Sequence, residues 1–168
     1  EVNMPSTYDA IYTTTLGSAQ SSVTIGSGGT ISQAYTDLVL VIQGSVASAG
    51  YFDMTVGNGS VDTGSNYSFI RMIGYSGGTL SDLYSNQTKL QPSLSSSNGL
   101  LVININNYSN TTTNKTFMWR ESDSSNGTAG DLGLWRSTSA INVIRLQGGA
   151  SNNINSGTMI TLYGILAA

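Results

Sequence analysis

The sequence contains no histidine and no cysteine, and only 9% of its residues are charged. Without histidine and cysteine the chain cannot form a Ser-His-Asp or Cys-His nucleophile, a thiolate or imidazole zinc site, or a disulfide scaffold. A metal ion could be held by oxygen ligands alone. Six Lys and Arg residues in a chain of 168 are too few for a surface that follows a phosphate backbone. Nucleic acid is therefore not an expected partner.

Long apolar runs are also missing. The longest uninterrupted run extends from Leu38 to Ile42, far below the roughly 20 residues that a membrane-spanning helix requires. The first seven residues contain neither the basic region nor the apolar stretch of a signal peptide. We therefore expect neither a membrane span nor a membrane partner.

Small neutral residues dominate what is present, since Ser, Thr, Asn and Gly together supply 80 of the 168 residues. Disordered chains share such a composition, but they lack aromatic and β-branched residues. This chain has nine Tyr, three Phe, two Trp and several runs rich in Val and Ile. The sequence therefore predicts one folded domain over residues 8–168. Residues 1–7 are expected to form either an arm that binds a neighbouring subunit or a frayed end.

Hydrophobic residues recur with a period of two, which is typical of strands. Turn signals such as Asn58-Gly59, Asn98-Gly99 and Asn126-Gly127 separate the candidate strands. The stretch 79–97 is the least regular and is expected to hold a long connection. The pattern predicts an all-β fold, an antiparallel β-sandwich of jelly-roll-like type with about ten strands. The expected strands are residues 8–16, 22–25, 37–43, 51–56, 66–73, 100–106, 116–121, 132–136, 141–146 and 159–165.

Carboxylates offer the few candidate sites for catalysis or metal binding. Glu121 and Asp123 would share one face of an extended segment, but no motif supports a catalytic pair, and the local sequence indicates a solvated turn. Loops around Asp53, Asp62 or Asp123 contain suitable oxygen ligands for calcium, although their spacing matches no known calcium loop. The glycine-rich residues 26–29 lack the following helix and lysine of a phosphate site. We therefore predict no catalytic residue, no cofactor and no metal.

Aromatic residues leave two interpretations open. Exposed together, they would form a face that stacks against sugars; buried, they would pack in the core or at a subunit interface. Trp119 and Trp135 each precede an arginine that points to the opposite side of its strand. The candidate aromatic residues are Trp119, Trp135, Tyr67, Tyr75, Tyr84 and Tyr108.

Several segments, in order along nearly the whole chain, resemble a known group of proteins. The segments that carry the resemblance are residues 4–8, 13–19, 35–41, 64–68, 85–88, 107–116, 133–142 and 162–168. The most specific is Gly-Leu-Trp-Arg-Ser-Thr-Ser-Ala-Ile-Asn at 133–142. Together they resemble small virion structural proteins of tailed bacteriophages, often from marine and cyanobacterial hosts. The resemblance implies a β-rich component of the virion surface without enzyme activity, and it supports a terminal arm as an anchor.

The expected function is that of a capsid decoration or cement protein on the exterior of the virion. Such a protein would be a homo-oligomer, a trimer being the expected form, and would bind a major capsid protein. The alternative is a tail-fibre, head-fibre or baseplate component that binds host surface glycans. The residues expected at interfaces are Met4, Pro5, Tyr8, Trp119, Trp135 and Arg136.

Overall fold

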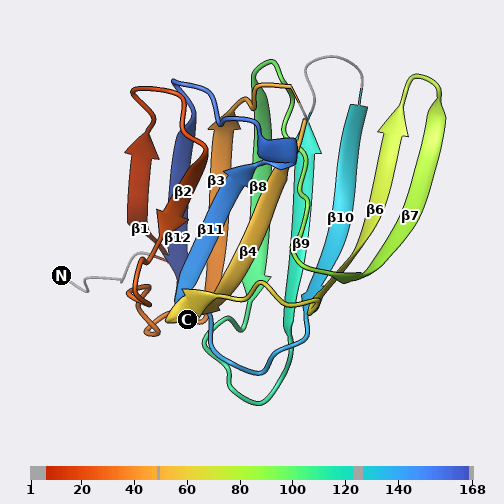
Figure 1. Ribbon diagram of the computed structural model, residues 1–168. Helices are drawn as coiled ribbons and strands as arrows, with labels where there is room; N and C mark the ends of the chain where they lie inside the picture. Colours follow the sequence, from red (N-terminus) through yellow and green to blue (C-terminus); the bar gives the residue numbers. More distant parts are fainter. Residues whose placement is uncertain (1–6, 49, 123–126, 167–168) are drawn as a thin grey trace.

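The computed structural model describes residues 7–48, 50–122 and 127–166. Within these ranges the chain forms twelve β-strands and one short 3-10 turn, η1 (Gly149–Ser151). The strands build an eight-stranded and a four-stranded antiparallel sheet, which lie in two layers (Figure 1). The predicted all-β antiparallel sandwich is therefore confirmed, whereas its jelly-roll connectivity stays a prediction.

The larger sheet has the strand order β1-β12-β3-β8-β9-β10-β6-β7. Figure 1 shows the smaller sheet lying over the part around β3 and β8, while β10, β6 and β7 continue beyond its edge. One end of the inner face is thus closed by a second sheet, and the other end is not. The strands of the larger sheet are β1 (Tyr8–Thr15), β3 (Asp37–Gly44), β6 (Tyr67–Tyr75), β7 (Gly78–Gln87), β8 (Gly99–Asn106), β9 (Lys115–Ser122), β10 (Gly127–Trp135) and β12 (Met159–Ile165).

The smaller sheet has the order β2-β11-β4-β5 and is extended by the connection between β7 and β8. In this connection Leu90 exchanges two backbone hydrogen bonds of 2.9 Å with Met54, and Ser93 forms an isolated bridge with Tyr51. Residues 90–94 therefore run beside β4. They cover part of the end of the larger sheet that the smaller sheet leaves uncovered. The strands of the smaller sheet are β2 (Ser22–Ile25), β4 (Phe52–Asn58), β5 (Ser60–Val61) and β11 (Val143–Gly148).

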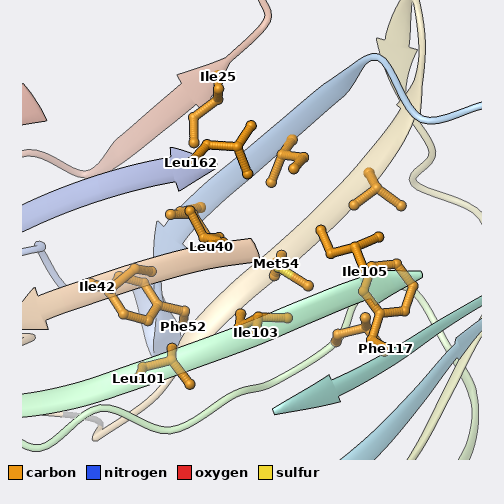
Figure 2. Packing of buried hydrophobic residues seen from close by; sticks show 14 of the residues in the cluster. Ile25, Leu40, Ile42, Phe52, Met54, Leu101, Ile103, Ile105, Phe117 and Leu162 are labelled. Carbon is orange, nitrogen blue, oxygen red and sulfur yellow. The ribbon is translucent and has the colours of Figure 1, made fainter. Parts of the chain in front are cut away.

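The core lies between the two sheets and follows the two-residue alternation of the strands. In β3, Leu38, Leu40 and Ile42 are fully buried, while the valines between them are only half-buried. Burying one such side chain contributes roughly 1.5–3 kcal/mol relative to leaving it exposed. Figure 2 shows how side chains from both sheets meet in this layer, and it labels Ile25, Leu40, Ile42, Phe52, Met54, Leu101, Ile103, Ile105, Phe117 and Leu162.

The stretch 79–97, the least regular part of the sequence, is a connection only in its second half. Residues 78–87 form β7, which contradicts the expectation of an irregular segment over 79–97. The reason is that β7 is an edge strand whose side chains are exposed or half-exposed, so it needs no apolar alternation. Gly59 adopts a φ of 75° between β4 and β5, which confirms the first predicted turn. Gly99 instead begins β8, and Asn126 lies outside the described residues.

Gly133 in β10 lies against the core, where a larger residue does not fit. A Cβ at this position would come within 2.7 Å of Cζ3 of Trp119 and 3.1 Å of Cδ2 of Leu90. We expect Gly133→Ala to lower the free energy of unfolding by about 2 kcal/mol, because overpacking pushes neighbouring side chains out of their preferred rotamers. Gly130→Ala, in the same strand, is the matched control, since a Cβ there meets nothing within 4 Å. Equal stability of the two variants in chemical denaturation would contradict the expectation.

Candidate functional site

Charged residues lie on the inner face of the larger sheet beyond the edge of the smaller one, and the strand register places one of them, Asp82 of β7, opposite Arg71 of β6. Three of these residues are Arg71 of β6, Glu121 of β9 and Asp131 of β10. Each lies on the same side of its strand as that strand's buried aromatic residues. The register of β9 and β10 pairs Trp119 with Asp131 and Glu121 with Ala129, so the two carboxyl groups lie in adjacent rows of one face. The charge of Arg71 acts on both carboxyl groups.

Asp131 is fully buried, and both of its oxygens accept hydrogen bonds. The indole Nε1 of Trp119 donates to Oδ2 at 2.9 Å, and the backbone N–H of Met72 donates to Oδ1 at 2.8 Å. Burial raises the pKa of the Asp131 carboxyl, although these two bonds and the charge of Arg71 oppose the shift. Asp131 thus ties β6 and β9 to β10.

Glu121 binds the connection between β7 and β8 to the larger sheet. Its Oε2 accepts a hydrogen bond of 2.5 Å from the backbone N–H of Ser93, and Nη2 of Arg71 donates to Oγ of the same serine at 3.1 Å. Burial raises the pKa of Glu121 to about 7; the negative charge of Asp131 adds to this, while Ser93 and Arg71 oppose it. Near neutral pH the side chain is therefore poised between its charged and neutral forms.

A half-open cavity of about 310 Å³ lies between this part of the sheet and the connection. Its floor combines apolar and polar groups, and its rim carries the ring of Tyr75, which is 50% exposed. The lining residues that matter for the argument are Arg71, Ile73, Tyr75, Ser93, Glu121 and Ala129.

The guanidinium of Arg71 has more donors than the protein uses. Of its five N–H groups, one donates to Ser93, the only acceptor that the described residues give it. Its Nε is buried without any hydrogen-bond partner in the part of the chain that the structure describes. A buried donor without an acceptor costs about 1–3 kcal/mol, so such a group calls for an explanation.

The arrangement suits ligand binding better than hydrolysis. A glycosidase of the usual type places two carboxyl groups on either side of the scissile bond. Asp131 cannot take part, because it is enclosed and both of its oxygens are engaged. Among the described residues that line the cavity, Glu121 alone contributes a carboxyl group. The described lining therefore offers one carboxyl and one guanidinium as charged contacts, beside the hydroxyl groups of serine and threonine residues.

The outer face of the larger sheet carries a second candidate surface, which we call the outer row. It consists of eight side chains, one from each strand, which the strand registers place side by side. Seven of the eight are apolar or aromatic, and the four at the β9 to β7 end are between 37% and 69% exposed. The outer row is Ala10, Tyr163, Val39, Asn104, Met118, Leu132, Ile70 and Leu83.

The interface residues expected from the sequence lie in different parts of the molecule, where the structure describes them. Trp119 is fully buried and Trp135 is 3% exposed, so neither indole offers surface to a partner. Each fills the core because it shares the inward phase of its strand. Tyr8 is exposed and packs edge-on against Tyr163, at a centroid distance of 6.2 Å. Met4 and Pro5, like residues 1–6 as a whole, lie outside the described residues.

Arg136 is half-buried, and its hydrogen bonds hold the segment that leads into β6. Its guanidinium donates to Oγ of Ser68 at 2.6 Å, to the carbonyl of Ser65 at 2.5 Å and to Oδ1 of Asn86 at 3.1 Å. These bonds join three segments of one subunit. The structure therefore gives Arg136 an intramolecular role at the β5–β6 and β7 ends.

The aromatic residues do not form an exposed sugar-binding face as a group. Tyr67 and Tyr108 are buried, like the two tryptophans. Their hydroxyls donate to backbone carbonyls inside the molecule, which satisfies the polar ends of the buried rings. Tyr84 stacks on Phe69 with a centroid distance of 4.6 Å. Tyr75, on the rim of the cavity, is the exposed member of the candidate set.

The aspartates considered for calcium have protein partners. Asp62 accepts hydrogen bonds from Trp135, Asn66 and the Gly64 amide, all at 2.8 Å. Burial alone would raise its pKa, but these bonds outweigh burial and hold the pKa below its usual value. Asp53 forms a 2.6 Å ion pair with Lys89. The described residues contain no group of three acidic, His or Cys residues placed to hold a metal ion.

Reasoning from the sequence missed the role of Glu121, which is 9% exposed rather than part of a solvated turn. Asp123 lies outside the described residues. A signal was present, because Glu121 is two residues from Trp119 and Asp131 is four from Trp135, so each shares its tryptophan's face. Arg71 stands in the same relation to Phe69. Charged residues in phase with buried aromatic residues mark the site.

Comparison of the sequence with protein-family models and with curated proteins gives no match. The part of the chain that the structure describes contains no helix long and apolar enough to cross a membrane.

Proposed function

We propose that the chain is a non-enzymatic structural protein of a tailed-bacteriophage virion, a decoration protein that binds the major capsid protein on the outer shell as a homo-oligomer. The resemblance of its segments to small virion proteins supports this proposal. The observation that carries it is the outer row, in which the exposed apolar side chains of Met118, Leu132, Ile70 and Leu83 lie side by side on the outer face of the sheet. Exposed patches of this kind mark protein interaction sites.

The dimensions of this face suit a stable protein contact. Eight strands spaced about 4.8 Å apart span roughly 34 Å, and eight-residue strands are about 27 Å long. The face therefore measures roughly 900 Å², close to the about 800 Å² that each partner contributes to a standard interface. A partner that binds only the assembled shell stabilises it by mass action.

Copy number tests this function. Quantitative mass spectrometry of purified virions is expected to find the chain in numbers comparable to those of the major capsid protein. A few copies per particle would contradict a decoration role and would favour a place in the tail.

Leu132→Asp is expected to reduce occupancy of the shell at least tenfold, because it places a charge in the middle of the outer row. Leu132 is 47% exposed, so the free energy of unfolding is expected to fall by about 1 kcal/mol, the span of strand propensities, and the variant stays folded. Thr116→Asp, on the exposed side of β9, is the matched control. Sedimentation of shells with each variant measures occupancy, and full occupancy with Leu132→Asp would refute the outer row as the contact.

A second function, a tail-fibre, head-fibre or baseplate component that binds host glycans, is favoured by one specific observation. The cavity beside Arg71 and Glu121 lies on the face opposite the outer row, and the described residues give the guanidinium of Arg71 a single acceptor, Ser93. The copy number of the chain separates the two functions.

A further inference from the structure

We infer that the cavity between β6, β9, β10 and residues 93–96 is a binding site for a single neutral sugar ring, held by Arg71, Glu121 and Tyr75. This inference deepens the second proposed function, but it does not depend on shell attachment, since the outer row lies on the opposite face of the sheet.

The hydrogen-bonding groups of the cavity call for a ligand that both accepts and donates. Among the described residues, Ser93 is the one acceptor of Arg71, so most N–H groups of its guanidinium lack protein acceptors. Within the same residues Glu121 accepts a hydrogen bond through Oε2, from Ser93, which leaves Oε1 to accept from a ligand. A hydroxyl group can accept from the guanidinium and donate to the carboxylate at the same time. Two neighbouring hydroxyls of a sugar ring satisfy both residues.

Charge argues against an ionic ligand. An anion attracted by Arg71 would also approach the carboxyl group of Glu121, which lines the cavity, and that of Asp82, which the register of β6 and β7 places opposite Arg71. A cation would meet Arg71 itself. The remaining class is a neutral molecule rich in hydroxyl groups.

The shape of the cavity limits the ligand to about one ring. Its volume of about 310 Å³ lies at the lower end of the range for small-molecule sites. Ile73 and Ala129 give the floor an apolar part, and the half-exposed ring of Tyr75 stands at the rim. An aromatic ring in this place can cover the apolar face of a sugar.

Nuclear magnetic resonance of the full chain tests the inference directly. The probes are methyl glycosides of glucose, galactose, mannose and N-acetylglucosamine, and the signal is the Nε–H resonance of Arg71. We expect at least one neutral glycoside to shift this resonance with saturation and a Kd on the order of 1 mM. The three other arginines of the sequence, Arg120, Arg136 and Arg145, supply internal reference signals.

Two variants and one control locate the site. Arg71→Gln is expected to weaken binding at least tenfold, and Tyr75→Ala about threefold to tenfold. Because Arg71→Gln lacks the guanidinium signal, its binding is followed through the backbone N–H resonance of Ser93, which lines the cavity. Tyr75 is half-exposed, so its variant stays informative even if Arg71→Gln fails to fold. Arg120→Gln, on the outer side of β9, should bind as the unaltered chain does.

Two results would overturn the inference: no shift of the Arg71 resonance with any of the neutral glycosides, or unchanged binding in Tyr75→Ala. Neither of them bears on shell occupancy, which is measured through Leu132. Failure of this inference and failure of the decoration role are therefore distinguishable.

Discussion

Replacing Asp131 with alanine is expected to lower the free energy of unfolding by about 4 kcal/mol. The carboxylate accepts from Trp119 Nε1 and from the Met72 amide, and it is fully buried. Its removal leaves two buried donors without acceptors, each costing about 1–3 kcal/mol, and takes away the bond that joins β6 to β10 at this point. Equilibrium denaturation in urea measures the loss.

Two variants bracket this expectation. Asp131→Asn keeps one carbonyl oxygen and can satisfy only one of the two donors, so about half of the loss is expected. Asp9→Ala, in the edge strand β1, should change stability by no more than about 0.5 kcal/mol. A loss below about 1 kcal/mol in Asp131→Ala would show that Trp119 and Met72 find other acceptors.

The stability of the protein is expected to decrease between about pH 4.5 and pH 7, because Glu121 has a raised pKa in the folded state. The pKa of this carboxyl rises from 4.5 to about 7 on burial. In that interval the folded protein binds more protons than the unfolded chain, so the free energy of unfolding falls as the pH rises. The full difference corresponds to at most about 3 kcal/mol.

Glu121→Gln is expected to flatten most of this decrease, since glutamine does not titrate. Asp131, with its raised pKa, contributes a residual slope of the same sign. Asp62, whose pKa is lowered, acts in the opposite direction, and its contribution is lost only as the pH falls through its folded pKa. Thermal melts from pH 4 to 8, with Asp9→Asn in the edge strand β1 as a control far from the site, measure the profile. An unchanged slope in Glu121→Gln would contradict the assignment to this residue.

The strands buried on one face could be predicted from the sequence, because burial imposes a period of two. Residues 37–43 were expected as a strand and form β3 with one residue more. The edge strand β7 could not be predicted in this way, since an edge strand with few buried side chains lacks that pattern. The first half of β10 also escaped prediction, because Gly127 and Gly130 have low strand propensity and only pairing with β6 and β9 holds them extended.

The candidate site followed from the sequence only in part. The positions of Arg71, Glu121 and Asp131, in phase with neighbouring aromatic residues, indicate which face each occupies within its strand. Nothing in the local pattern indicates that β6 lies beside β10, because three other strands of the chain separate them. Long-range pairing therefore decides that the three residues meet.

The near-absence of charge, the lack of histidine and cysteine, and the two-residue alternation determined the fold class of this protein and excluded whole classes of chemistry. Composition and local periodicity can be read from the sequence, because neither depends on contacts between residues far apart in the chain. The tertiary structure decided that the tryptophans fill the core, that eight separate side chains align as the outer row, and that a guanidinium and a carboxyl share one cavity. These features depend on strand order and register, which arise from contacts between residues far apart in the sequence.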